Sequence, residues 1–599
     1  MTLPTPAKLG LTSPRAAQDI EELSLDDAAL LWTLAGAGDP DLALNTAHRF
    51  AGALPSEWDE VRSALAADPE FCTRFFALLG GSTALSDHLV ANPHLWRELA
   101  APLPSEEEMR EAMLRAVEAE HIDEATYRAG ARFSDKHAAK DALRETYRTL
   151  MMRIAAADLA GTFTPLKGHG GTTPVGYQRT TALLTALADA ALTAALAVAI
   201  RQVYGDDNPD TALAVVAMGK CGARELNYIS DVDVIFVAEE ATAKATHTAS
   251  EFMQLGTACF FEVDANLRPE GKAGALVRTL DSHVTYYKRW AETWEFQALL
   301  KARPTGAVSL GKRYVEKLAP LVWEASQRES FVEDVQAMRR RVLANVPESL
   351  RQRELKLGEG GLRDVEFAVQ LLQLVHGRID ESLREPNTVE ALNSLMVGGY
   401  VGREDTDKLI RAYEFLRLLE HRLQLQRFKR THQLPAADDE KRLRWLARTA
   451  GFQATARHTA VEEMQRALTQ LRGVVANLHE RLFYRPLLEA VVDLSIGEAT
   501  FSADAVKAQL AALGYRHPAR AYDHLNALVK GTSRKAKLQA ILLPTLMHWL
   551  AGTADPGAGL LNYRKLSDAA LDRSWFLRML RDEGVGGMRL MHILSLIHI

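Results

Sequence analysis

The residues MGKCGARELNYISDVDV, at positions 218–234, link two apolar runs of the chain. The first run, Thr211–Met218, is continuous and is typical of a strand buried on both faces. The second run, Asp231–Ala238, is equally apolar but opens with two acidic residues. Side chains two positions apart on a strand share a face, so we predict that Asp231 and Asp233 point the same way.

Two carboxylates on one strand face repel each other unless a cation compensates their charge. Their roots lie about 7 Å apart, which lets them converge on one ion. Asp264 follows on the polar face of the alternating run Glu262–Leu267 and is the candidate third ligand. Hard oxygen ligands favour magnesium or manganese over zinc. We therefore predict a site in which Asp231, Asp233 and Asp264 hold two hydrated metal ions, the alternative being a chance acidic pair without metal.

Two such ions suit phosphoryl or nucleotidyl transfer, because they activate the attacking oxygen and stabilise the leaving one. The glycines before Asp231 let the backbone approach a phosphate closely. The Gly219-Lys220 pair lacks the preceding glycine of a Walker P-loop. Arg268 has two interpretations: it binds phosphate oxygens as a fork, or it forms a structural salt bridge to Glu262 or Glu270.

Length and composition bound the class of protein. At 599 residues the chain has a prior of roughly four domains. Its 47% hydrophobic and 25% charged residues are average for globular proteins, which excludes wholesale disorder. The net charge of −6 gives no general attraction to nucleic acid or anionic membranes. Three widely spaced cysteines fit neither a disulfide framework nor a zinc site, so we expect a cytoplasmic protein.

The segment Thr180–Ile200 imitates a membrane span, since Asp189 is its single charge. Its bulk is alanine and threonine, and we predict a buried helix of a folded domain instead. The N-terminal residues Met1–Asp19 have no signal-peptide core and are expected to form a loose tail.

We expect an α+β fold that is mostly helical, with a small mixed sheet between helical domains. The predicted parts are an N-terminal helical region at 1–165, a nucleotidyltransferase core at 166–308, a helical bundle at 309–490 and a helical stretch at 491–599. The clearest helical periodicities are Ala28–Leu34, Phe71–Leu79, Leu143–Leu159, Val332–Val346, Val365–Val375, Leu409–Phe428 and Ala460–Leu482.

The glycines, the Asp-x-Asp pair and the later aspartate resemble the DNA polymerase β-like nucleotidyltransferase superfamily. Four strings in order resemble the bifunctional glutamine synthetase adenylyltransferase/adenylyl-removing enzymes more closely, over most of residues 20–590. They are GKCGARELNYISDVDVIF at 219–236, VDANLRPEGK at 263–272, LKLGEGGLRDVEFAVQ at 355–370 and EHRLQLQRFKRTHQLP at 420–435.

That family carries two nucleotidyltransferase domains. The N-terminal one removes AMP from a tyrosine of glutamine synthetase by phosphorolysis, giving ADP, and the C-terminal one attaches AMP from ATP. This chain has one glycine-to-Asp-x-Asp unit and stops in the apolar run Met588–Ile599, so we expect a truncated chain with the N-terminal half and, at 491–599, a helical linker and the beginning of the second half. The resemblance implies partners: glutamine synthetase as protein substrate, phosphate and ADP or ATP, and a PII-type signal protein.

The resemblance also implies site roles. The metal ligands would be Asp231, Asp233 and Asp264, and the phosphate-facing loop would comprise Gly219, Gly222 and Ser230. In the third string Arg363, Asp364 and Glu366 open a glycine-preceded helix and are secondary candidates that could face the cleft. Their alternative is that Asp364 and Glu366 only complement the helix dipole.

Further positions and functions have more than one interpretation. The basic residues Arg427, Lys429 and Arg430 are a solvated helix face, or else a docking surface for an acidic partner. Three other functions compete with AMP removal: forward adenylyl transfer from ATP, a non-catalytic scaffold that binds nucleotide or signal protein, and a template-directed polymerase. The acidic net charge argues against the polymerase.

Overall fold

The computed structural model describes residues 3–493, apart from 124–125, 307–308 and most of 328–345, and beyond these mainly 515–529, 546–570 and 584–596. The chain divides into two compact units. Unit 1 comprises Met1–Ala325 and Val342–Val475, and unit 2 comprises Ser326–Arg341 and Ala476–Ile599. The four-part division predicted from sequence stays a prediction, and the predicted helix at 332–346 lies largely outside the described residues.

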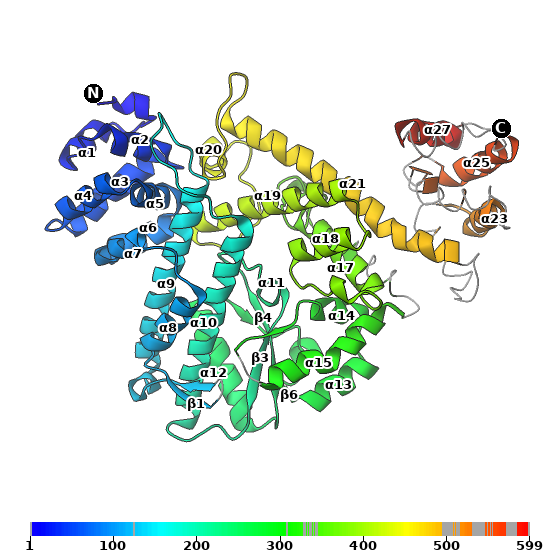
Figure 1. Ribbon diagram of the computed structural model, residues 1–599, viewed down its shortest axis with the longest axis horizontal. Helices are drawn as coiled ribbons and strands as arrows, with labels where there is room; N and C mark the ends of the chain where they lie inside the picture. The colour runs from blue at the N-terminus through cyan, green and yellow to red at the C-terminus, as the bar shows by residue number, and fades with distance from the viewer. Residues whose placement is uncertain are drawn as a thin grey trace. The chain divides into compact units, whose positions relative to one another are not determined.

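A small mixed sheet occupies the middle of unit 1, as predicted (Figure 1). The apolar run that contains the second aspartate of the pair forms β4 (Val232–Ala238), which is antiparallel to β3 (Leu213–Ala217). On its other edge β4 is parallel to β5 (Val263–Asp264) at its beginning and to β6 (Val277–Thr279) at its end. The short β7 (Arg303–Pro304) pairs antiparallel with β3.

The alternation of β4 gives its two faces different neighbours. Val232, Val234, Phe236 and Ala238 belong to the large hydrophobic core, where Phe236 meets Phe252 of α12 edge to face at 5.6 Å. Asp233 lies on the opposite face, because its position alternates with theirs. Helix α12 (Ala243–Cys259) packs on β5 and β6, and α15 (Ser309–Glu324) packs on β3 and β4.

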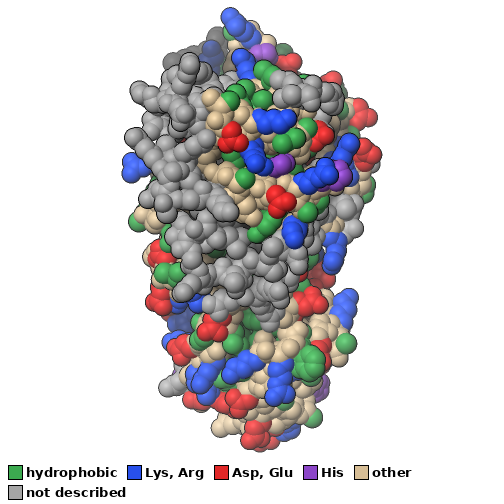
Figure 2. Space-filling model, turned by 90° about the vertical axis from the view of Figure 1, so that its right-hand side faces the viewer, with side chains coloured by type: hydrophobic (Ala, Val, Ile, Leu, Met, Phe, Trp, Pro, Cys, Tyr) green, Lys and Arg blue, Asp and Glu red, His purple; other side chains and the backbone are tan. Residues whose placement is uncertain are grey.

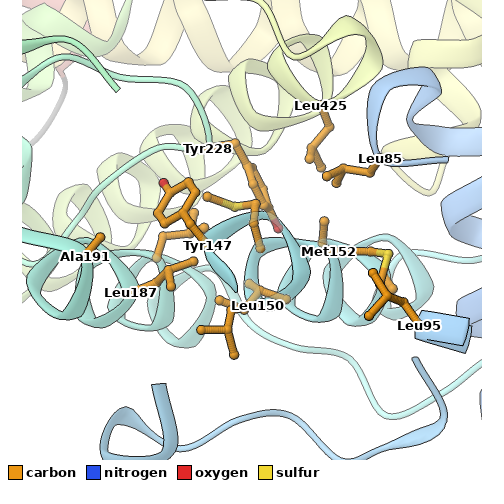
Figure 3. Close-up of a cluster of buried hydrophobic side chains, with 14 of the residues drawn as sticks. Leu85, Leu95, Tyr147, Leu150, Met152, Leu187, Ala191, Tyr228 and Leu425 are labelled. Carbon is orange, nitrogen blue, oxygen red and sulfur yellow. The ribbon is translucent and has the colours of Figure 1, made fainter. Parts of the chain in front are cut away.

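Two long helices extend the hydrophobic core beyond the sheet. They are α9 (Lys136–Gly161) and α10 (Tyr177–Tyr204), which pack against each other. Figure 3 shows Tyr147 and Leu150 of α9 beside Leu187 and Ala191 of α10, with Met152 farther along α9 and Leu425 from a distant helix. The core is therefore shared between the N-terminal helices, the sheet and the later bundle.

Helix α10 contains the segment that imitates a membrane span. Among the described residues it is the one helix with the length and hydropathy of a span, and 78% of its apolar window is buried inside the folded chain. The charge that interrupts it, Asp189, forms a two-pronged ion pair with Arg303 at 2.9 and 3.0 Å. The prediction of a buried helix is confirmed.

The predicted loose tail is wrong. A 3-10 turn at Pro6–Leu9 and helix α1 (Ala16–Glu22) order this segment, because Leu9 and Leu11 are buried in the core. The backbone of Thr12 and Ser13 also donates hydrogen bonds to Asp41.

The other helices of unit 1 cover its N-terminal side and its bundle. They are α2 (Ala28–Gly36), α3 (Pro40–Ala53), α4 (Trp58–Ala67), α5 (Pro69–Gly81), α6 (Thr83–Ala91), α7 (Trp96–Ala100), α8 (Glu106–Ala116), α11 (Gly219–Gly222), α13 (Leu280–Arg289), α14 (Thr293–Leu299), α17 (Leu362–His376), α18 (Thr388–Val397), α19 (Arg403–Arg427), α20 (Glu440–Thr449) and α21 (Ala460–Asp493), whose end enters unit 2, with a hairpin of β1 (Glu120–Asp123) and β2 (Thr126–Arg128).

Unit 2 is helical where it is described. Helices α23 (Pro518–Val529), α25 (Pro556–Ala570) and α27 (Gly584–Leu596) pack around a small core that includes Leu550, Leu560, Tyr563 and Met591.

On the molecular face in Figure 2, the described basic and acidic side chains are interspersed. The predicted class, α+β and mostly helical with a small mixed sheet, is confirmed.

Candidate active site

The register of the sheet brings the predicted aspartates to one place. Asp233 of β4 lies directly opposite Asp264 of the parallel strand β5. Asp231 comes just before β4, two residues from Asp233, and its charge acts on the carboxyl of Asp233. The two strands are joined there by a hydrogen bond of 2.9 Å from the Val232 amide to the Glu262 carbonyl. The three carboxylates therefore flank the beginning of two parallel strands.

Burial and neighbouring charge act differently on the carboxyls at positions 231 and 233. Burial, together with the charges of Asp231 and Asp264, raises the pKa of Asp233 to about 6. Burial is the largest single influence on Asp231 and acts to raise its pKa, but the charges of Arg430, Lys356 and Lys220 together outweigh it, and the pKa of that carboxyl is lowered. Arg430 donates from Nη2 to Oδ2 of Asp231 at 2.6 Å and from Nη1 to Glu262 at 3.4 Å. A compensating cation is thus already present beside Asp231.

The donor set of this site fits a magnesium or manganese ion. All three residues offer carboxylate oxygen, and the raised pKa of Asp233 reflects negative charge that a divalent ion would relieve. The carboxylate oxygens of the three aspartates do not all lie close together. Among the described residues, the one group of three or more possible ligands whose atoms all lie within 4.8 Å of one another is Asp19, Glu22 and His48. Ligands of one octahedral ion lie within about 4.2 Å of each other. Shared binding of one ion by all three aspartates therefore requires them to move together.

The loop before Asp231 packs so closely that two of its positions need glycine. Gly219 has a φ of +54°, and a Cβ there would lie 2.7 Å from Oδ2 of Asp233. A Cβ on Gly222 would lie 1.7 Å from the Lys301 carbonyl oxygen. Ser230 donates from its hydroxyl to Asp231 at 3.3 Å. Gly219 and Ser230 thus adjoin the aspartates, Gly222 serves backbone packing, and the phosphate-facing role of all three stays a prediction.

Helix α19 holds the same loop from the other side. The Gln424 side chain accepts a hydrogen bond from the Ile229 amide at 2.9 Å, and His421 lies 3.2 Å from the Asn227 amide oxygen. Arg417, which is fully buried, donates to the Glu225 carbonyl. These contacts give the string at 420–435 a structural role, which is to hold in place the loop that leads to Asp231.

Two buried ion pairs reinforce this attachment. The Glu225 carboxylate pairs with Lys301 and accepts from the Thr388 hydroxyl at 3.0 Å. Arg422, which is fully buried, forms a fork with Asp158 of α9 at 2.7 and 3.0 Å. Each pair joins segments far apart in sequence, so loop, bundle and N-terminal helices are held together around the site.

The third string reaches the site through Glu366. Burial opposes its ionisation, but Lys220 and Lys301 lower the pKa of Glu366 to about 2. Burial in turn lowers the pKa of Lys220 to about 8. Arg363 lies 3.7 Å from Glu366. Because Glu366 faces cations of the loop, it does more than complement the dipole of α17.

Asp364 and Arg268 mainly hold loops. Asp364 accepts from the Gly360 amide at 2.7 Å, just before α17 begins. Arg268 donates to the carbonyls of Gly274, Ala265 and Lys272, between 2.8 and 3.1 Å. Its alternative salt bridge is wrong, because Glu262 pairs with Arg430 and Glu270 with Arg278. Binding of phosphate by Arg268 stays a prediction.

Comparisons with known proteins found a matching family model and similar relatives. Residues 72–313 match the family model of glutamate-ammonia ligase adenylyltransferase. The chain is 59% identical over 626 residues to the bifunctional glutamine synthetase adenylyltransferase/adenylyl-removing enzyme of Corynebacterium glutamicum, an alignment covering 99% of this chain and 59% of the relative. Over these residues the chain is similar to the glutamate-ammonia ligase adenylyltransferase family.

Further relatives with the same printed name align equally far. The bifunctional enzymes of Nocardia farcinica and Mycolicibacterium smegmatis are 54% and 52% identical, each over 99% of this chain and 59% of the relative. The chain thus spans about 59% of the length of these curated relatives. The expected truncation is not confirmed, since the alignments cover 99% of this chain. Residues 336–483 also match the family model of GlnD PII-uridylyltransferase, a likeness confined to the bundle.

Sequence reasoning missed four charged residues at the adenylyltransferase-family site. Lys220 and Lys356 lower the pKa of Glu366, and Glu420 is a buried neighbour of Lys220. Arg430 pairs with Asp231 and lies beyond the end of α19, so it is not on a helix face, and docking of an acidic partner by this basic segment stays a prediction. All four stand inside the quoted strings, so their presence there was the available signal. Nothing local in the sequence indicated which of them turn toward the aspartates.

Proposed function

We propose that this chain removes AMP from an adenylylated tyrosine of glutamine synthetase by phosphorolysis, with a magnesium or manganese ion held by Asp231, Asp233 and Asp264. The observation that carries the proposal is the register of β4 and β5, which sets Asp233 opposite Asp264 and beside Asp231. The names of the relatives support the substrate, since they are glutamine synthetase adenylyltransferase/adenylyl-removing enzymes. Their names cover both directions, and the choice of AMP removal is ours.

The reaction is an in-line displacement at phosphorus. An oxygen of inorganic phosphate forms a bond to the AMP phosphorus, the bond from that phosphorus to the tyrosine oxygen breaks, and the tyrosine oxygen takes up the proton that phosphate brings. The products are ADP and free tyrosine. The bound divalent ion would supply charge neutralisation on the phosphoryl oxygens.

The chain's own residues align the reactants and compensate charge. Asp233 and Asp264 hold their positions through the strand pairing, and Asp231 through the loop anchored by α19. Lys220 and Lys356 place positive charge beside Asp231 and Asp233, which favours anionic reactants. Glu366 in turn offsets the charge of Lys220. The proposed partners are glutamine synthetase as protein substrate, with phosphate and ADP as the small reactants. We also propose a PII-type signal protein as regulator and the cytoplasm as the location.

The direction of the reaction is tested with two incubations of the purified chain. One contains adenylylated glutamine synthetase, phosphate and magnesium, and the other contains unmodified glutamine synthetase, ATP and magnesium. We expect ADP release and loss of AMP from the protein in the first. If label from ATP is transferred to glutamine synthetase in the second incubation, and no ADP is released in the first, the result would instead favour forward adenylyl transfer.

The site is tested by Asp233→Asn with Glu239→Gln as the matched control. Glu239 follows the far end of β4 and pairs with Arg313 at the surface. We expect Asp233→Asn to lower AMP removal at least about 100-fold, as removal of one stabilising charge interaction does in other enzymes. The control should stay within about twofold of the unsubstituted chain. Equal turnover in both variants would refute the metal centre, and turnover in neither direction by the unsubstituted chain would favour a scaffold.

A further inference from the structure

Arg430 stands where the chain leaves α19 and turns toward the sheet. Phe428 ends the helix in a left-handed conformation with a φ of 52°. Two residues later the Arg430 guanidinium bridges Asp231 at 2.6 Å and Glu262 at 3.4 Å. The Arg430 side chain is 47% exposed, so the guanidinium can leave Asp231 without opening a core.

The guanidinium occupies an oxygen that a cation would need. Oδ2 of Asp231 accepts from Arg430, while Oδ1 accepts from the Ser230 hydroxyl. A divalent ion that takes Oδ2 of Asp231 as a ligand competes with the stronger of these bonds, because a positive guanidinium and a positive ion repel each other at one carboxylate. Glu262 is not one of the three aspartates and can keep the guanidinium nearby.

We propose that Arg430 is a displaceable counter-ion of this centre: it pairs with Asp231 while no divalent ion is bound, and an entering ion moves it onto Glu262. The proposal rests on the metal centre of the proposed function. It explains how a half-buried, acidic strand edge folds without its ion, and why the three aspartates do not place their oxygens within bonding distance of one ion.

The test is a titration of the metal-free full-length chain with Mn²⁺, following free Mn²⁺ by electron paramagnetic resonance. Arg430→Gln removes the competitor, and we expect Mn²⁺ to bind about two- to fivefold more tightly, the range that a partly exposed ion pair permits. Lys429→Gln removes a neighbouring exposed charge that has no contact with Asp231 and should leave the affinity unchanged. Unchanged or weaker binding by Arg430→Gln, or equal tightening in both variants, would overturn the proposal.

A second measurement needs no variant. Phenylglyoxal modifies accessible arginines, and mass spectrometry of peptides follows each site. Mn²⁺ should speed modification of Arg430 relative to the exposed Arg427 of the same segment, whereas an unchanged ratio would contradict displacement. Asp233→Asn in the same Mn²⁺ titration separates the two claims. If that variant binds Mn²⁺ as well as the unsubstituted chain, the metal centre itself fails, and the role of Arg430 falls with it.

Discussion

Asp233→Asn should stabilise the folded chain in metal-free buffer, even though we expect it to abolish activity. The pKa of Asp233 is raised from 3.8 to about 6 by burial and by Asp231 and Asp264. Each pKa unit is worth about 1.4 kcal/mol, so the ionised carboxylate costs the folded state about 3 kcal/mol at neutral pH. A neutral asparagine of nearly equal size removes that cost.

The pH dependence follows from the sign of this pKa change. Between 3.8 and about 6 the folded chain keeps the Asp233 proton while the unfolded chain has lost it. The contribution of Asp233 to stability is therefore full below pH 3.8 and lost as the pH rises through 6. The advantage of Asp233→Asn should reach about 3 kcal/mol at pH 7.5 and about half of that at pH 5.

The assay is thermal unfolding by circular dichroism or calorimetry, with chelator present, at these two pH values. For a unit of this size about 3 kcal/mol corresponds to a rise in Tm of about 3 °C. The control is Asp231→Asn, which should give no gain, because the pKa of Asp231 is lowered and its charge pairs with Arg430. A Tm for Asp233→Asn at or below that of the unsubstituted chain at pH 7.5 would refute the electrostatic reasoning.

Two further substitutions test the framework around the site. Arg422→Ala leaves the charge of Asp158 buried without its partner, so we expect a loss of about 3–5 kcal/mol in stability, measured by denaturant unfolding. Gly222→Ala drives a methyl group to 1.7 Å from the Lys301 carbonyl oxygen and should sharply reduce the yield of folded protein. Gly52→Ala, in a helix with open space around it, should instead gain about 0.5–1 kcal/mol, and a loss there as large as at Gly222 would undermine the packing argument.

The strands were predictable because continuous apolar runs and strict alternation are local signals. Observed β3 and β4 fall inside the predicted runs, but β5 ends at Asp264, short of the predicted Leu267. The reason is the Asp264 side chain itself, which accepts from the Asn266 amide at 2.7 Å and turns the chain. Such competition between a side chain and the strand ladder depends on the geometry of the neighbouring elements.

By itself, the sequence determined three strands of the small sheet within a helical chain, the glycine loop and the two-residue spacing of Asp231 and Asp233, because each follows from patterns of a few residues. Only the tertiary structure decided that Asp264 lies opposite Asp233 and that Arg430 pairs with Asp231. The latter two residues are 199 positions apart. Strand register and long-range ion pairs depend on how whole helices and strands pack together, and the local periodicity of the sequence does not specify that packing.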